Sequence, residues 1–278
     1  MPQARSGRPG ARRPTQGSDL GARIAAGIPA AIFAIVIVVM GGGVFAAGAA
    51  LLGLICLHEL YAMYDHLRPA RLAGFAGLIA LVVAAQVGET YHVLLVLAAS
   101  VAVVFLLTVA GPSIEGGTAG MAITLLGVSW VGVAIAHAVM LRELPHGGGI
   151  VADVLVGTFV GDTGAYFGGR ALGRQKLAPR LSPNKTVEGL FAGVVTAVLA
   201  VWIAGLYQDW LSGTDALLLG VAVALAAPVG DLFESFIKRD AGTKDTGRLF
   251  GAHGGALDRL DAILFTLVVG YYVWNGML

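Results

Sequence analysis

The stretch YHVLLVLAASVAVVFLLTVA, residues 91–110, contains no charged residue and is long enough to cross a lipid bilayer as a helix. The whole chain of 278 residues has the same character, because 57% of its residues are hydrophobic and only 13% are charged. Its mean hydropathy is +0.81. A soluble domain carries about 25% charged residues, and one with far fewer would expose large apolar patches to water. The composition therefore predicts an integral membrane protein.

Apolar windows of similar length recur along the chain on both sides of this stretch, and they predict an all-α, polytopic transmembrane helix bundle of about nine spans. The windows are 23–41, 44–62, 71–88, 91–110, 119–141, 148–168, 188–208, 216–237 and 257–277.

The chain divides into three regions by composition. Residues 1–22 are basic and rich in Gly and Pro, and we expect them to form a disordered tail. Residues 23–147 hold the N-terminal transmembrane helices. Residues 148–278 hold the remaining helices, together with two polar loops at 170–187 and 238–256. These loops mix basic, acidic, Gly and Ser/Thr residues, which indicates a chemical role beyond fixing orientation.

The basic residues predict how the bundle lies in the membrane. If the N-terminus is cytoplasmic, all of the 18 Lys and Arg residues except Arg142 fall in the tail or in cytoplasmic loops and helix ends. Cytoplasmic segments of membrane proteins carry this excess of positive charge. We therefore expect an N-terminus in the cytoplasm, a multi-pass protein of the inner (plasma) membrane, and a functional site that faces the cytoplasm.

The most informative polar stretch is DLFESFIKRDAGTKDTGRLFGAHGGALDRLD, residues 231–261, which holds six of the chain's 17 acidic residues. Asp231, Glu234, Ser235 and Lys238 share one helix face, because residues three and four apart are neighbours on a helix. Ionisable groups at membrane depth are costly and mark functional sites. Asp240 and Glu234 are interpreted as solvated or supporting residues.

Paired carboxylates on two helices predict a Mg²⁺ site, since Mg²⁺ takes carboxylate oxygens and completes its shell with water and substrate phosphates. Asp231 would contribute from one helix, and Asp258 and Asp261 from the start of the last one. A second bound cation is left open. Lys and Arg side chains nearby would hold phosphate oxygens. The pattern indicates phosphoryl or nucleotidyl transfer at the membrane edge, and the P-loop motif of soluble nucleotide enzymes is absent from the sequence.

This stretch also resembles the signature of the phosphatidate cytidylyltransferase (CDP-diglyceride synthetase) family. The matching positions are Ser235, Lys238-Arg239, Lys244-Asp245, His253-Gly254-Gly255, Asp258-Arg259 and Asp261. A second block, GDTGAYFGGRALGRQKLAPRLSPNKTVEG at 161–189, is similar to the family's other motif. Its matching positions are Asp162, Tyr166, Ser182, Pro183, Lys185, Thr186, Glu188 and Gly189. The segment 59–63, ELYAM, also looks like the family's, although it is short.

Two of these residues have a purely structural alternative. Thr186 and Glu188 fit the start of a helix, where a threonine caps the first turn and an acidic residue favours it.

The resemblance implies that the phosphate of phosphatidic acid attacks the α-phosphorus of CTP, which gives CDP-diacylglycerol and pyrophosphate for phospholipid synthesis. The residues expected to act in catalysis are Asp231, Lys238, Arg239, Lys244, Asp245, His253, Asp258, Arg259 and Asp261. Those expected to bind substrate are Asp162, Arg174, Ser182, Lys185, Ser235, Gly254 and Gly255.

The expected partners are CTP, phosphatidic acid and membrane lipids. A net charge of +1 gives no reason to expect a nucleic acid, and a homodimer is left open. The closest alternatives are a CTP-dependent polyprenol kinase and a cytidylyltransferase for another lipid phosphate. An ion-coupled transporter ranks last, because the charges gather at one membrane face and no inverted repeat is visible.

Overall fold

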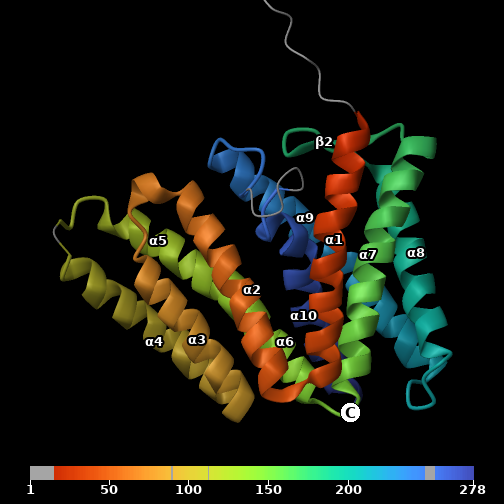
Figure 1. The fold of residues 1–278 in the computed structure, drawn as a ribbon, viewed down its shortest axis with the longest axis horizontal. Helices are drawn as coiled ribbons and strands as arrows, with labels where there is room; N and C mark the ends of the chain where they lie inside the picture. The colour runs from red at the N-terminus through yellow and green to blue at the C-terminus, as the bar shows by residue number, and fades with distance from the viewer. Residues whose placement is uncertain (1–15, 89, 112, 248–253) are drawn as a thin grey trace, which may run out of the picture.

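The computed structural model describes residues 16–88, 90–111, 113–247 and 254–278. Within these ranges the chain is a bundle of helices with one small hairpin (Figure 1). In chain order the elements are α1 (Gln16–Met40), α2 (Gly42–Met63), the 3₁₀-helix η1 (Asp65–Leu67), α3 (Arg71–Val87), α4 (Thr90–Val109), α5 (Gly117–Gly127), the π-helical turn η2 (Val128–Gly132), α6 (Val133–Glu143), α7 (Gly147–Leu172), β1 (Lys176–Ala178), β2 (Ser182–Thr186), α8 (Val187–Gly205), α9 (Gly213–Asp240) and α10 (Leu257–Met277).

The all-α, polytopic fold is confirmed. In the part of the chain that the structure describes, seven helices are long and apolar enough to cross a membrane, and two shorter apolar helices, Ile28–Met40 and Arg71–Val87, accompany them. One of the seven is continuous through α5, η2 and α6, over Gly117–Glu143. The total of nine spans and the cytoplasmic N-terminus stay predictions.

One expectation about the N-terminus is corrected. Helix α1 begins at Gln16, so residues 16–22 are helical and not part of a disordered tail. The sequence has no proline between Pro14 and Pro29, so nothing prevents the helix from extending outward beyond the apolar window. Residues 1–15 lie outside the described part.

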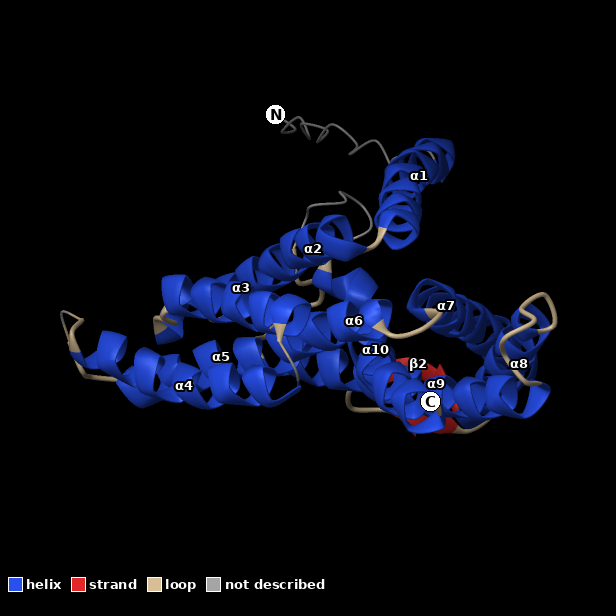
Figure 2. Cartoon of the chain, turned by 90° about the horizontal axis from the view of Figure 1, so that it is seen from below, coloured by secondary structure: helices blue, strands red, loops and turns tan. Residues whose placement is uncertain are grey.

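The helices form two groups that meet along the middle of the molecule. Seen from below, α2 to α6 lie on one side and α7 to α9 on the other, with α10 between them (Figure 2). Helix α10 packs against α6 of the first group and against α7 and α9 of the second. The buried core runs through both groups, and its largest fully buried side chains include Tyr61, Leu141 and Leu264.

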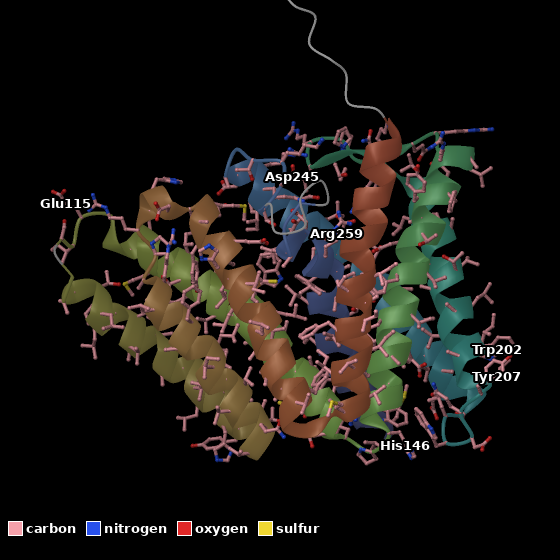
Figure 3. The ribbon with its side chains drawn as sticks, viewed as in Figure 1. Glu115, His146, Trp202, Tyr207, Asp245 and Arg259 are labelled. Carbon is pink, nitrogen blue, oxygen red and sulfur yellow. The ribbon has the colours of Figure 1, made fainter. Side chains whose placement is uncertain are left out.

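The two ends of the bundle differ in chemistry. Asp245 and Arg259 lie toward the upper end in Figure 3, on the side of the β1–β2 hairpin, whereas His146, Trp202 and Tyr207 lie at the lower end. At the lower end His146 also stacks on Trp210, with ring centroids 4.4 Å apart. Aromatic side chains collect in this way at a membrane–water boundary. The polar upper end is where the loops expected to carry chemistry lie.

Candidate functional site

A cavity of about 790 Å³ opens between α7, α8, α9 and α10 beside strand β2. Most of the predicted site residues that the structure describes line it: Asp162, Lys185, Asp231, Lys238, Asp245, Asp258, Arg259 and Asp261. They come from two separate blocks of sequence, 162–185 and 231–261, which the fold brings to one place. The cavity continues among small and apolar residues, Gly157, Gly161, Gly193, Ala197, Ala224, Ala227 and Pro228 among them. One cavity therefore joins a charged end to an apolar one.

The charged face of α9 pairs with both neighbouring elements. The Asp231 carboxylate forms an ion pair with Lys185 of β2. Two helical turns further on, the Lys238 ammonium lies 2.5 Å from Glu234 Oε2 and 2.9 Å from Asp258 Oδ1 of α10. The side chain of Glu234 is only 1% exposed, so its interpretation as a solvated residue is wrong and that of a supporting residue fits. Lys238 thus joins two carboxylates from two helices.

Asp258 is held from several directions. Besides Lys238, its Oδ2 accepts hydrogen bonds from the backbone N–H groups of Thr246, at 3.0 Å, and of Gly255, at 2.7 Å. A carboxylate in the first turn of a helix is also favoured by the helix dipole. These contacts fix the position of Asp258 at the start of α10.

The approach of α9 to α10 depends on Gly230. A β-carbon at this position would lie 2.6 Å from the carbonyl oxygen of Asp261 and 3.0 Å from Cα of Ala262, which no real side chain tolerates. The two backbones therefore come close enough for Asp231 and Asp261 to line one cavity. Asp162 of α7 lines the same cavity.

The hairpin of β1 and β2 was not predicted. Its strands are antiparallel, with Lys176 opposite Thr186 and Ala178 opposite Ser182. The polar, Gly- and Pro-containing segment lacks the alternation of apolar and polar residues that marks a strand. The hairpin is what presents Lys185 to the cavity.

The structural interpretation of Thr186 and Glu188 is confirmed. Thr186 is the N-cap of α8, and its hydroxyl accepts a hydrogen bond from the backbone N–H of Gly189 at 3.1 Å. Glu188 Oε2 accepts from the backbone N–H groups of Arg174, at 3.0 Å, and of Gln175, at 3.2 Å. Both residues anchor the hairpin to the first turn of α8.

Some predicted residues lie outside the lining of the cavity. They are Arg174, Ser182, Ser235, Arg239, Lys244, Gly254 and Gly255 among the described residues. Arg239 instead donates from Nε to the carbonyl oxygen of Leu181 in the hairpin at 3.2 Å. It therefore ties the hairpin to the end of α9. His253 was predicted to act in catalysis and lies outside the described residues.

A second contact at this end of the molecule involves Tyr64, just past the end of α2. Its hydroxyl donates to Asp240 Oδ2 at 2.7 Å and lies 3.2 Å from the carbonyl oxygen of Ile237. Burial and the neighbouring Asp240 carboxylate raise the pKa of Tyr64 well above its usual value. Asp240 is therefore a supporting residue that joins α9 to the first group of helices.

The carboxylates at the charged end were predicted to form a magnesium site. In the described ranges no group of three or more His, Cys, Asp or Glu side chains is arranged to hold a metal ion. Three carboxylates from three helices, Asp162, Asp231 and Asp261, nevertheless face one cavity together with Asp258. Carboxylate oxygens of this kind are the ligands that Mg²⁺ prefers.

Sequence reasoning missed Glu59 of α2. The segment 59–63 was matched to the family as a short motif, but no role was predicted for Glu59. In the structure its buried carboxylate accepts hydrogen bonds from the turn that leads into α10. A carboxylate among apolar residues near the end of a membrane helix is costly, and this signal could have identified it as part of the site.

The sequence of this chain is similar to those of known proteins over most of its length. Residues 21–276 match a family described as the cytidylyltransferase family. The chain is 37% identical to the uncharacterized protein YnbB of Escherichia coli, over 60% of this chain and 59% of that protein. It is 36% identical to a phosphatidate cytidylyltransferase of Staphylococcus epidermidis, over 52% of this chain and 56% of that protein.

A phosphatidate cytidylyltransferase of Haemophilus influenzae is 42% identical, over 42% of this chain and 43% of that protein. The chain thus spans about half the length of the curated relatives it matches.

Proposed function

Because this chain belongs to the cytidylyltransferase family, we propose that it condenses CTP with phosphatidic acid to give CDP-diacylglycerol and pyrophosphate. The observation that carries the proposal is the cavity that joins charged groups to an apolar end. A phospholipid substrate needs both environments, because its phosphate must meet a nucleotide while its acyl chains stay in the bilayer. Relatives named phosphatidate cytidylyltransferase support the same reaction.

In this reaction a phosphate oxygen of phosphatidic acid bonds to the α-phosphorus of CTP. The bond from that phosphorus to the bridging oxygen of the β-phosphate breaks, and pyrophosphate leaves with the electron pair. The attacking oxygen is already ionised at neutral pH, so no strong general base is needed. Catalysis then depends on bringing two anions together and on stabilising the charge that spreads over the phosphates.

The cations of the cavity have two different roles in this proposal. Lys185 and Arg259 line the cavity and would contact phosphate oxygens of the substrates. Lys185 is paired with one carboxylate, that of Asp231, whereas Lys238 is paired with two, those of Glu234 and Asp258. The contribution of Lys238 would be to hold Asp258 in place.

We further propose that Mg²⁺ is held by Asp231, Asp258 and Asp261. When bound, the ion would neutralise phosphate charge and orient the α-phosphate. The carboxylates of these residues line the cavity, which supports the assignment. The expected second cation and the homodimer stay predictions.

The placement in the membrane is a further proposal, which the polar end of the molecule supports. We propose that the protein resides in the inner membrane with the cavity facing the cytoplasm. The hairpin and the charged cavity residues lie at one end of the bundle, and that end carries the basic loops (Figures 1 and 3). CTP would reach the cavity from the cytoplasm, and the lipid would enter between helices.

A product assay tests the proposed function. The full chain in detergent is given Mg²⁺, phosphatidic acid and CTP labelled at the α-phosphate. Label in the lipid phase with an equal amount of free pyrophosphate supports the proposal. Release of CDP when a polyprenol is supplied would assign the chain to the kinases, and transfer only to another lipid phosphate would change the substrate. No turnover with any of these lipids would contradict the enzyme function.

The apolar end of the cavity yields a separate prediction. Ala227 lies one helical turn from Asp231 on the cavity face of α9. Ala227→Leu fills space where an acyl chain would lie, and should raise KM for phosphatidic acid about tenfold or more, as changes of one or a few methylenes in such pockets do. KM for CTP should stay the same. Initial rates at varied lipid and nucleotide concentrations measure the two constants.

Ala152→Leu is the matched control, because Ala152 is exposed on α7. It should leave both constants at their wild-type values. An unchanged lipid KM in Ala227→Leu, or an equal rise for CTP, would show that the acyl chains lie elsewhere.

A further inference from the structure

Glu59 lies in the last turn of α2, in the group of helices that does not line the cavity. Glu59 is only 6% exposed. A carboxylate that loses its water must be compensated by hydrogen bonds or by opposite charge. Glu59 obtains that compensation from hydrogen bonds with the turn that leads into α10.

Three donors from this turn converge on the Glu59 carboxylate. Oε1 accepts a hydrogen bond from the backbone N–H of Ala256 at 3.0 Å. Oε2 accepts from the backbone N–H of Leu257 at 2.9 Å and from the hydroxyl of Thr246 at 3.1 Å. The first N–H groups of a helix have no partner within the helix, and the N-cap residue of α10, Ala256, offers no side-chain oxygen. Glu59 therefore caps α10 from a different helix.

Two glycines show how closely the turn fits around this carboxylate. A β-carbon at Gly247 would lie 2.7 Å from Cδ of Glu59, and one at Gly255 would come closer still. Both distances are shorter than any real side chain tolerates. The backbone on both sides of residues 248–253 is thus packed directly against Glu59.

The same backbone also holds Asp258 in the cavity. Thr246 donates from its hydroxyl to Glu59 and from its backbone N–H to Asp258 Oδ2. Gly255 donates its backbone N–H to Asp258, and the next residue, Ala256, donates to Glu59. The turn is held between two carboxylates, one outside the cavity and one lining it. A displacement of the turn away from Glu59 must therefore move the groups that fix Asp258.

The geometry points to Glu59 as a positioning residue for the transfer reaction: it fixes the turn formed by Thr246, Gly247 and Gly254–Leu257, and through that turn the carboxylate of Asp258. This role rests on the proposed function. Within the described residues, the hydrogen bonds of the Glu59 side chain go to this turn and not to a residue that lines the cavity. Glu59 would therefore act on the orientation of Asp258 and not on substrate directly.

Glu59→Gln is the decisive variant, because it keeps the size of the side chain and removes one acceptor. Glutamine offers one oxygen to three converging donors, so its amide N–H₂ must face at least one backbone N–H. In the full chain in detergent, amide hydrogen exchange of residues 254–260 should speed up about tenfold or more, and kcat should fall by about the same factor, because a lost charged hydrogen bond in a buried position has this effect. KM for CTP should change less.

Asp153→Asn is the matched control. Asp153 is another buried carboxylate, 2% exposed, on α7, and its Oδ1 accepts from Gln208 Nε2 at 2.9 Å. This variant should leave exchange of residues 254–260 and kcat unchanged, whatever it does to unfolding. Glu59→Asp keeps the charge but is one methylene shorter, and should fall between Glu59→Gln and the wild type in both exchange and kcat.

The outcomes separate the two proposals. Wild-type exchange or wild-type kcat in Glu59→Gln overturns the positioning role, as does a loss of kcat without faster exchange. An equal loss of kcat in Asp153→Asn would make the effect one of general stability and would also overturn it. If the wild-type chain makes no CDP-diacylglycerol, the proposed function fails, while the exchange comparison still reports whether Glu59 holds the turn.

Discussion

Asp231→Asn should lower kcat by on the order of a thousandfold while the protein unfolds at nearly its wild-type temperature. Asp231 forms an ion pair with Lys185 and lines the same cavity as Asp162 and Asp261. Asparagine keeps the shape of the side chain but removes the charge that would bind Mg²⁺ and balance Lys185. The measurement is initial rates of label transfer at saturating Mg²⁺, together with thermal unfolding in the same detergent.

Asp209→Asn provides the same chemical change at an exposed position in the connection between α8 and α9. It should keep wild-type turnover. Activity of Asp231→Asn within a fewfold of the wild type would remove the proposed metal role of Asp231. Loss of folding in Asp231→Asn but not in Asp209→Asn would instead give Asp231 a structural role.

Lys238→Met should cost about 3–5 kcal/mol of stability, the range measured when one partner of a buried ion pair is removed. The side chain of Lys238 is 15% exposed and those of its two partners are 1% (Glu234) and 8% (Asp258) exposed. Without the ammonium, two buried carboxylates face each other at the junction of α9 and α10. The unfolding midpoint in a denaturing-detergent titration should therefore fall sharply.

A double variant shows whether the loss is electrostatic. Glu234→Gln removes one of the two buried carboxyl groups, so Lys238→Met/Glu234→Gln should unfold at a higher midpoint than Lys238→Met alone. Lys176→Met, at an exposed position of β1, should have little effect. A double variant no more stable than Lys238→Met would show that the lysine contributes by packing and not by charge.

Helix positions followed closely from the sequence because each apolar run is bounded by polar residues. The windows 71–88 and 257–277 correspond to Arg71–Val87 and Leu257–Met277. The window 148–168 was too short, since α7 extends to Leu172. Its last turns are polar and basic, and hydropathy cannot distinguish a polar helix end from a loop.

The candidate site was predicted in part. The polar stripe on α9 follows from helical spacing, and the two motif blocks led to most of the residues that line the cavity. The match to the family over residues 21–276 confirms the resemblance on which the function was predicted. The distinction between Arg239, which binds the hairpin backbone, and Lys185, which faces the cavity, depends on the hairpin itself. Sequence spacing carries no information on which side of a hairpin a cation lies.

Glu59 could not be assigned a partner from sequence, because its hydrogen bonds join residues 187 to 198 positions apart. Contacts of this separation are set by tertiary packing alone.

During synthesis on the ribosome, the Glu59 carboxylate is made well before its hydrogen-bond donors in the turn that leads into α10. At about 5–20 residues per second, the helix that carries Glu59 is made roughly 10–40 s before the amide groups that will receive its carboxylate. During that interval the Glu59 carboxylate must be solvated by water or by lipid headgroups. Its place in the final turn of α2, four residues before the end of the helix, keeps it within their reach. The Glu59 carboxylate therefore stays solvated in this way until α10 is made and the N–H groups of Ala256 and Leu257 replace water or headgroups as its donors.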